Sequence, residues 1–209
     1  MRIAVFGSTG MVGANVVAEA LDRGHDVDAV SRNPVASALD RLTGHAVDVA
    51  DRAAVAGVLS QVDAAVLTIR LAPGEEHQIA PLTQGFLEAA AGTRVLIVGG
   101  SAPLRTPNDP GRLVIDDPRF VPEQWQPIAR ASLAQFHVWQ EFRDAGAVYL
   151  SPPAVLEPGV RAGRYRRGGT TLLVDADGRS AISAADLAIA VVDELEQPCR
   201  EPHFTVAQL

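Results

Sequence analysis

The first thirteen residues constrain the fold of this chain more than any other stretch. Residues 2–6 are an almost wholly apolar run, glycines with GxxGxxG spacing follow directly, and apolar residues then recur at helical spacing over 11–21. The three glycines are Gly7, Gly10 and Gly13. A strand, a glycine turn and a helix start in this order predict a phosphate-binding turn, because a helix start offers unpaired N–H groups and the positive end of its dipole. This context favours a dinucleotide site over a glycine-rich turn of another α/β domain.

The composition narrows the class of protein. The formal net charge of -7 argues against general binding to nucleic acid or to an anionic membrane, since both need a positive field. Cys199 is the single cysteine, so no internal disulfide can form, and no apolar run approaches the ~20 residues that a membrane span requires. Met1 leads straight into the first expected strand, without a secretory leader. We therefore expect a soluble, cytoplasmic protein with no nucleic-acid or membrane partner.

Strand and helix patterns alternate through the first half of the chain. Strands are expected at 2–6, 27–30, 45–49, 62–69 and 94–98, and helices from 11, at 34–42, at 53–59 and up to 91, with a late start or a kink at Pro81. Such alternation with short connections predicts an α/β fold of the Rossmann type. It consists of a doubly wound parallel sheet with helices on both faces and with ligand at the carboxyl ends of the strands.

The second half of the chain follows a different pattern. The proline-rich residues 102–127 predict a long loop that forms part of a substrate wall, or else a mobile surface excursion. After it come a helix at 128–145, a strand at 147–151, a basic loop at 163–169, a small hairpin at 170–178, a helix opened by a capping box at Ser183 and a strand at 203–207. We predict a single domain over residues 1–209, in which 102–127 and 152–182 form the substrate-side loops and a small C-terminal lobe.

The end of the second strand bears on the choice of cofactor. In dinucleotide folds this position faces the adenosine ribose, and an acidic side chain there hydrogen-bonds the ribose of NAD. Here Ser31 is followed by Arg32, whose guanidinium matches a phosphate in charge and geometry. The pair predicts a 2′-phosphate site, and hence NADP(H) in preference to NAD(H). The alternative is an ordinary exposed arginine in a turn.

Two further strand ends are expected at the same edge. Asp48 ends the third strand, where it either contacts the adenine amine or caps the helix that starts near Asp51, and Asp51 itself is the better candidate for the cap. Thr68 and Arg70 end the fourth strand and are expected beside the cofactor.

Several stretches, taken in order, resemble one protein family. They are Gly7-Ser8-Thr9-Gly10-Met11-Val12-Gly13, Ser31-Arg32-Asn33-Pro34, Val98-Gly99-Gly100-Ser101, Leu150-Ser151-Pro152-Pro153 and Ile182-Ser183-Ala184-Ala185-Asp186-Leu187-Ala188. Over essentially its whole length the chain resembles the atypical short-chain dehydrogenase/reductases. The similarity is greatest to the NAD(P)H-binding, NmrA-like group that includes the biliverdin reductase B-type flavin reductases. This resemblance implies a Rossmann fold, a bound NADP(H), and a substrate pocket lined by the long loop and the C-terminal lobe.

The resemblance also implies which residues bind the cofactor. The pyrophosphate would lie on the glycine turn, which comprises Gly7, Ser8, Thr9, Gly10, Met11, Val12 and Gly13. Arg32 would hold the 2′-phosphate, and Asp48 and Val49 would lie at the adenine. Thr68 and Arg70 would lie near the ribose and nicotinamide, and Pro152, Pro153 and Ala154 over the nicotinamide.

The chain departs from the wider superfamily at the catalytic acid. Typical members carry a Tyr-xxx-Lys pair, in which the lysine helps the tyrosine to protonate a carbonyl oxygen. This chain contains no lysine, and its two tyrosines are Tyr149, on an expected strand, and Tyr165, in the basic loop. The usual alcohol–ketone chemistry therefore lacks its acid.

Few other side chains are candidates for chemistry. Ser101 is the catalytic candidate, because it sits where the superfamily can place a substrate-binding serine or threonine; it is otherwise a turn residue. His137 is a second candidate acid, although a structural or surface role suits it better, since no carboxylate at i±4 orients it. His25 and His77 are expected at the surface. The arginines of 163–169 offer an anion site or a solvated loop tip, and no histidine pair has a metal-ligand spacing, so no metal is expected.

These observations support two hypotheses of different class. The first is an NADPH-dependent oxidoreductase, monomeric or homodimeric, whose small-molecule acceptor is a flavin, a quinone or a similar compound that takes hydride directly and gains its proton from water. The second is a non-catalytic NADP(H)-binding redox sensor, motivated by the same missing Tyr-Lys pair. Sugar-nucleotide epimerase chemistry fits less well, because it also uses that pair.

Overall fold

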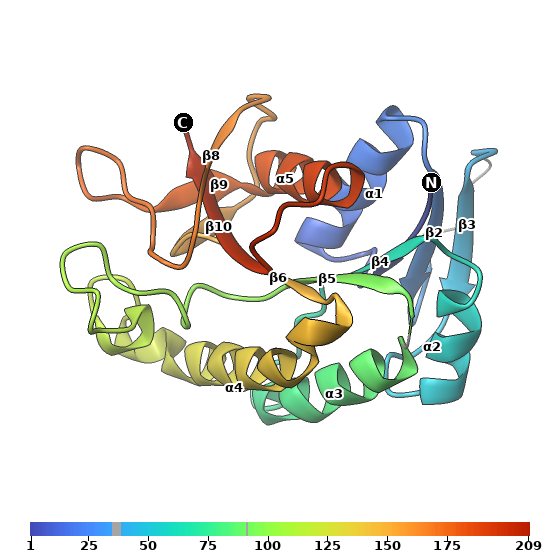
Figure 1. Ribbon diagram of the computed structural model, residues 1–209, viewed down its shortest axis with the longest axis horizontal. Helices are drawn as coiled ribbons and strands as arrows, with labels where there is room; N and C mark the ends of the chain where they lie inside the picture. The colour runs from blue at the N-terminus through green and yellow to red at the C-terminus, as the bar shows by residue number, and fades with distance from the viewer. Residues whose placement is uncertain (35–38, 91) are drawn as a thin grey trace.

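An eight-stranded sheet forms the centre of the molecule, whose computed structural model describes residues 1–34, 39–90 and 92–209 (Figure 1). Its strands are β1 (Arg2–Phe6), β2 (Asp26–Ser31), β3 (Leu42–Ala46), β4 (Ala64–Leu67), β5 (Arg94–Val98), β6 (Val148–Ser151), β8 (Tyr165–Gly168) and β10 (His203–Gln208). They lie in the order β3-β2-β1-β4-β5-β6-β10-β8, and all neighbours are parallel except β10 and β8. This is the order of a doubly wound sheet that reverses direction beside β1.

Helices cover both faces of the sheet (Figure 1). Helices α1 (Met11–Asp22) and α5 (Ala184–Glu196) pack together on one face, and α2 (Arg52–Leu59), α3 (Ile79–Ala89) and α4 (Gln126–Phe142) cover the other. Four short 3₁₀ helices complete the helical elements of the described residues: η1 (Glu76–Gln78), η2 (Val114–Asp116), η3 (Glu123–Trp125) and η4 (Arg143–Ala145). Because both faces are covered, the central strands are mostly apolar, and β4 is apolar and buried at every residue. The Rossmann-type α/β fold expected from the sequence is thus confirmed.

The proline-rich segment 102–127 is packed against the rest of the molecule, so it is not a surface excursion. A third apolar cluster lies beneath it, formed by Ala102, Leu104, Val114, Ile115, Val121, Ala129 and Leu172. Backbone hydrogen bonds close the segment on itself, with Val114 N donating to Leu104 O at 2.8 Å, and Arg105 bonds to residues 170 and 172. The buried leucines and valines between the prolines explain why the segment folds back onto the body.

Two predicted elements near the second and third strands have different bounds. The third strand is Leu42–Ala46 rather than 45–49, because its register against β2 begins where Leu42 pairs with Val27. The helix expected over 34–42 falls partly on residues 35–38, outside the described residues, and Leu42 already belongs to β3. Helix α3 starts at Ile79, so Pro81 lies in its first turn, where a proline is tolerated, and the expected late start is confirmed.

The C-terminal lobe differs more from expectation. The basic loop at 163–169 is largely a strand, β8, which pairs antiparallel with the open edge of β10. The hairpin at 170–178 is wrong: this stretch holds a turn in which Asp175 N donates to Arg179 O at 2.9 Å, and no strand pair flanks it. Instead β7 (Val155–Glu157) and β9 (Ala181–Ser183) form a two-stranded parallel sheet. Ser183 caps α5 through a hydrogen bond from Asp186 N at 3.0 Å, as predicted.

A buried histidine holds the last strand against the sheet. His203 is 8% exposed, and its Nε2 lies 3.0 Å from the Oγ of Ser151. The rings of Phe136, Trp139 and Tyr149 surround the imidazole, with centroids 4.7 to 5.8 Å away. Burial among these groups disfavours the charged imidazolium and lowers the pKa of His203 to about 4.

We predict that His203 makes the free energy of unfolding depend on pH. Between pH 6.5 and about 4 the unfolded chain binds a proton at His203 that the folded chain does not, so stability falls as the pH falls, by about 3 kcal/mol in total. Replacing the pair (His203→Phe with Ser151→Ala) should flatten this part of the stability profile in urea titrations. His137→Gln, at an exposed histidine, is the control and should leave the slope unchanged. Identical slopes for all three proteins would contradict the prediction.

Candidate functional site

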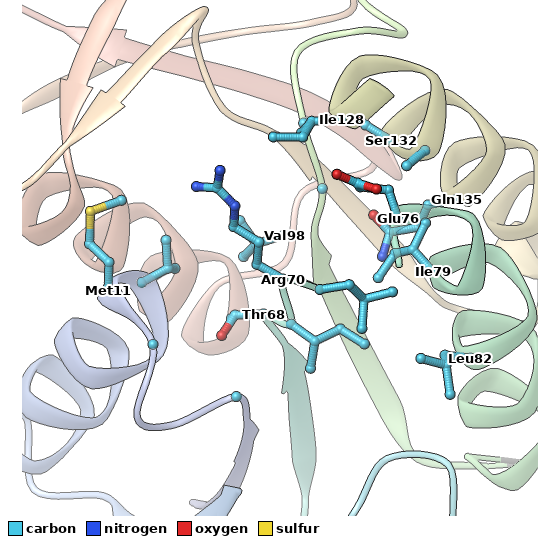
Figure 2. A pocket seen from close by; sticks show the side chains of 18 of the residues that line it. Met11, Thr68, Arg70, Glu76, Ile79, Leu82, Val98, Ile128, Ser132 and Gln135 are labelled. Carbon is cyan, nitrogen blue, oxygen red and sulfur yellow. The ribbon is translucent and has the colours of Figure 1, made fainter. Parts of the chain in front are cut away.

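A cavity of about 900 Å³ opens at the carboxyl ends of the parallel strands (Figure 2). Its walls come from the turns after β1, β2, β4, β5 and β6 on one side, and from η1, η3, α3 and α4 on the other. Ligands of doubly wound sheets bind at this edge, where the strand order reverses. The cavity is therefore the candidate site.

The turn after β1 is shaped by two close approaches that only glycine permits, at Gly7 and Gly13, and by a third, tight one at Gly10. Gly7 has φ +87°, and a Cβ there would lie 2.7 Å from the carbonyl oxygen of Thr68. A Cβ on Gly13 would lie 2.2 Å from the carbonyl oxygen of Gly7, and one on Gly10 would lie 3.2 Å from the same atom. The start of α1 thus packs directly onto the end of β1, which leaves the outer side of the turn open to a ligand.

The start of α1 suits an anion. Gly10 occupies the N-cap without a side-chain hydrogen bond, and the first turn holds no acidic residue. The turn is anchored from behind, because Gly7 N and Ser8 N donate to Val30 O at 2.9 and 3.2 Å. The helix therefore presents its positive end to the cavity, and no side chain hydrogen-bonds to it, as the diphosphate of a dinucleotide requires.

The end of β2 carries an unpaired hydroxyl and a cation. Ser31 is 9% exposed, and its Oγ is buried with no hydrogen-bond partner among the described residues. Arg32, the next residue, is exposed and lines the cavity. Because a buried hydroxyl without a partner is costly, a hydrogen bond from Ser31 to a ligand or to water would stabilise this end of β2. A hydroxyl and a guanidinium at this strand end fit the ribose of a dinucleotide, so the cavity is suited to such a cofactor.

Some polar side chains that follow β3 and β4 already form hydrogen bonds within the protein. The Oδ1 of Asp48 accepts a hydrogen bond from Ala50 N at 2.9 Å, and Asp51 caps α2 through Ala54 N, so the predicted cap at Asp51 is confirmed. The hydroxyl of Thr68 donates to Phe6 O at 3.2 Å. Arg70 is exposed, and in Figure 2 it extends from the end of β4 into the space between Met11 and Ile128.

The cavity brings together most of the residues that the sequence assigned to the site. Those that line it are Gly7, Thr9, Gly10, Met11, Val12, Arg32, Asp48, Val49, Thr68, Arg70, Ser101, Pro152, Pro153 and Ala154. Two do not line it: Ser8 is 8% exposed and Gly13 is buried inside α1. Both support the turn from behind, through the backbone bond of Ser8 and the packing of Gly13 against Gly7. Their contacts with a cofactor remain predictions.

The structure adds polar and aromatic groups that the sequence analysis did not name. They are Trp125 on η3 and three residues labelled in Figure 2: Glu76 on η1, and Ser132 and Gln135 on α4. The i, i+3 spacing of Ser132 and Gln135 places both on one face of α4, and it is the only sequence signal that marks them. Glu76 and Trp125 lie in irregular segments, where no periodicity points to them.

The turn after β5 packs tightly against α4. A Cβ on Gly99 would lie 1.9 Å from the hydroxyl oxygen of Tyr149, and one on Gly100 would lie 2.5 Å from the Oγ of Ser132. The Oγ of Ser132 is buried and has no hydrogen-bond partner among the described residues. Ser101 follows these glycines and lines the cavity, so its position, although not its role, agrees with the prediction.

The tyrosines and His137 do not replace the missing acid. Tyr149 is fully buried, which raises the pKa of its phenol, and its hydroxyl lies 3.4 Å from the Oε1 of Gln135. Tyr165 donates to the Oδ2 of Asp193 at 2.7 Å, and its pKa is also raised, by burial and by that carboxylate. Neither tyrosine lines the cavity, nor does the exposed His137.

Several charged residues outside the cavity are used within the fold. Arg167 contacts the carboxylate of Glu194 at 2.7 Å and lies 3.6 Å above the ring of Phe204, and Arg166 donates to Val174 O at 2.9 Å. The proposed anion site or solvated tip at these two arginines is therefore wrong, because β8 turns them onto the sheet and α5. His25 is 9% exposed and bonds to Glu196, so it is not a surface residue, whereas His77 is exposed as expected.

Comparisons with known proteins agree with this geometry. A family model described as NAD(P)H-binding matches residues 7–198. The uncharacterised protein YwnB of Bacillus subtilis (strain 168) is 34% identical over 211 residues, which cover 99% of this chain and 98% of that protein. A candidate NADH-flavin reductase from Streptococcus pneumoniae TIGR4 has a TM-score of 0.90 at 27% identity over 100% of both chains. A candidate epimerase from Bacteroides thetaiotaomicron has a TM-score of 0.88 at 33% identity, over 100% of this chain and 97% of that one.

The protein has a Rossmann fold with a cavity at the edge of the sheet where such folds bind nucleotides. The chain belongs to the NAD(P)H-binding family. Within it, the chain groups with atypical short-chain dehydrogenase/reductases. Membership supports a nicotinamide cofactor and an oxidoreductase type of function. Among the described residues, no helix is long and apolar enough to cross a membrane.

We predict that Gly13→Ala damages the cofactor site, because its methyl group collides with the backbone of Gly7 and must displace the turn. The expected result is loss of stability by about 1–3 kcal/mol, as for overpacking elsewhere, with at least tenfold weaker NADPH binding. Gly57→Ala is the matched control, since nothing lies within 4 Å of a Cβ at this position in α2, and it should stabilise by about 0.5–1 kcal/mol. Thermal melts and NADPH titrations measure both effects. Equal NADPH affinity in the two variants would contradict the prediction.

Proposed function

We propose that this protein is an NADPH-dependent oxidoreductase that reduces a flavin, a quinone or a similar small acceptor without a Tyr-Lys pair. The observation that supports this most is the continuity of one cavity. The glycine turn and the ends of β2 and β4 line one part of it, and apolar side chains of α3, α4 and the 102–127 segment line the other. A dinucleotide bound on the first part would place its reactive end beside the second.

Hydride transfer suits the groups that this cavity contains. A reduced nicotinamide, when bound, supplies a hydride (two electrons and one proton) to the acceptor, and the second proton comes from water. The chain contributes binding and orientation: the glycine turn and α1 hold the diphosphate, and Pro152 and Pro153 cover the nicotinamide end. No described side chain that lines the cavity is a tyrosine or histidine, which favours acceptors that need no dedicated acid.

Preference for NADPH over NADH rests on Arg32 and Ser31. Both residues line the cavity at the end of β2, where a 2′-phosphate would lie, and the hydroxyl of Ser31 has no partner among the described residues. No acidic residue replaces them at this strand end, so a ribose hydroxyl of NADH would lack its usual acceptor. The neighbour from Streptococcus pneumoniae, a candidate NADH-flavin reductase, supports the acceptor class but not this preference.

We predict that Arg32→Glu reverses the cofactor preference. NADPH binding should weaken about 10- to 100-fold, since a charge-assisted contact is lost and a like charge faces the phosphate, while NADH binding changes little. Fluorescence titrations with both cofactors at one fixed ionic strength give the two ratios. Arg200→Glu makes the same change of charge at an exposed position away from the cavity and should leave both affinities unchanged. A wild-type protein that bound NADH as tightly as NADPH would count against the 2′-phosphate site.

We predict that purified protein oxidises NADPH when a free flavin or a quinone is supplied. The measurement is the loss of NADPH absorbance across a panel of flavins, quinones and simple ketones, and ketones should be the poorest acceptors because no acid serves them. The absence of turnover throughout the panel would overturn the proposal. The alternative, a non-catalytic redox sensor, then requires that NADP⁺ and NADPH bind with different affinity, since ligands with equal affinity switch nothing.

A further inference from the structure

Glu76 places a carboxylate inside the part of the cavity assigned to the acceptor. It lies on η1, immediately before α3, and η1 packs against α4. Its Oε2 accepts a hydrogen bond from Gly74 N at 2.8 Å, which fixes the side chain. Figure 2 shows the carboxylate directed into the cavity, which Ile128, Ser132 and Gln135 also line. One oxygen is thus held by the backbone, and the other remains for a ligand.

The surroundings of Glu76 are mostly apolar. The residues that line this part of the cavity include Ile79, Leu82, Phe120, Val121, Trp125 and Ile128. A carboxylate among such groups is costly unless a donor satisfies it. A ligand that fills the cavity displaces the water that solvates the carboxylate, so this ligand must itself provide a donor.

No neighbouring side chain among the described residues provides this donor. Among the described residues, Glu76 forms no ion pair, and neither of the two arginines that line the same cavity, Arg32 and Arg70, is in one. Gln135 is 4% exposed and already bonded, since its Nε2 donates to the Oγ1 of Thr83 at 3.1 Å and its Oε1 faces the hydroxyl of Tyr149. The carboxylate of Glu75 also lines the cavity but is exposed, and the Oγ of Ser132 is buried. The second oxygen of Glu76 is therefore the half-buried carboxylate acceptor on this wall.

We propose that Glu76 selects the acceptor by accepting a hydrogen bond from a ring N–H, so that a planar heterocycle bearing such a donor is preferred to a quinone. This inference rests on the proposed function. A quinone offers only carbonyl oxygens, whose lone pairs repel a carboxylate. A flavin offers a ring N–H between two carbonyl groups, and the N–H matches the carboxylate. The half-exposed indole of Trp125 lines the same cavity and provides an apolar surface for a flat ring.

The test compares two acceptors that should respond in opposite directions. In Glu76→Leu, kcat/KM for lumiflavin should fall about tenfold or more, because a hydrogen bond to a charged group is lost, while kcat/KM for menadione should rise. Glu76→Gln keeps an oxygen that can accept the N–H but removes the charge, so it should fall between the wild type and Glu76→Leu. A general disturbance of the cavity would lower both rates together.

A binding measurement identifies the N–H itself. Wild-type protein saturated with NADP⁺ should bind lumiflavin about tenfold or more tightly than 3-methyl-lumiflavin, which lacks the N–H, and this ratio should fall to about one in Glu76→Leu. Glu123→Leu, on η3 and not among the cavity residues, removes the same charge and should keep the wild-type ratio.

The possible results separate this inference from the proposed function. If the wild type oxidises NADPH with both acceptors and the ratios do not depend on residue 76, the role of Glu76 is refuted and the oxidoreductase stands. If the wild type reduces neither acceptor, the proposed function is refuted, and the role of Glu76 with it.

Discussion

The close contact between the start of α1 and the end of β1 is the constraint on which the rest of the site depends. Gly13 lies against the carbonyl of Gly7, and Gly7 lies against the carbonyl of Thr68, so three elements meet with no side chain between them. This contact sets the direction of α1 and leaves its positive end open at the sheet edge. The ends of β2 and β4 then lie on either side of β1, because both strands pair with it directly. The cavity follows from this arrangement.

Much of the fold could be predicted because its signals are local. The strands β4 and β5, in the middle of the sheet, are apolar runs apart from Arg94. The start of α5 is marked in the sequence by Ser183, whose side chain caps the helix. The second half was harder to predict, because its pairing is decided by distant partners. Residues 165–168 form a strand because they pair with the open edge of β10. The residues of 163–169 contain no signal of this pairing. The proline-rich segment folds back for a similar reason, through contacts with α4 and Leu172.

The two halves of the candidate site differed in the same way. Residues that follow strands were predictable, since the carboxyl ends of parallel strands share one edge, and nearly all of them line the cavity. Residues on the opposite wall of the cavity were not predictable, because Glu76 and Trp125 belong to 3₁₀ turns whose positions depend on packing. The sequence placed His203 and Tyr149 on strands but did not predict their burial among aromatic rings. Their neutral states are imposed by aromatic neighbours from α4 and β6.

The packing of segment 102–127 over its own small apolar cluster has an evolutionary consequence. This cluster shares no residue with the two clusters that hold the sheet to its helices. Substitutions within it can therefore reshape this wall of the cavity while the glycine turn and the main core stay intact. Under the proposed function, chains with this scaffold would differ in their acceptor through changes in this segment, which makes it a suitable place to graft a new specificity.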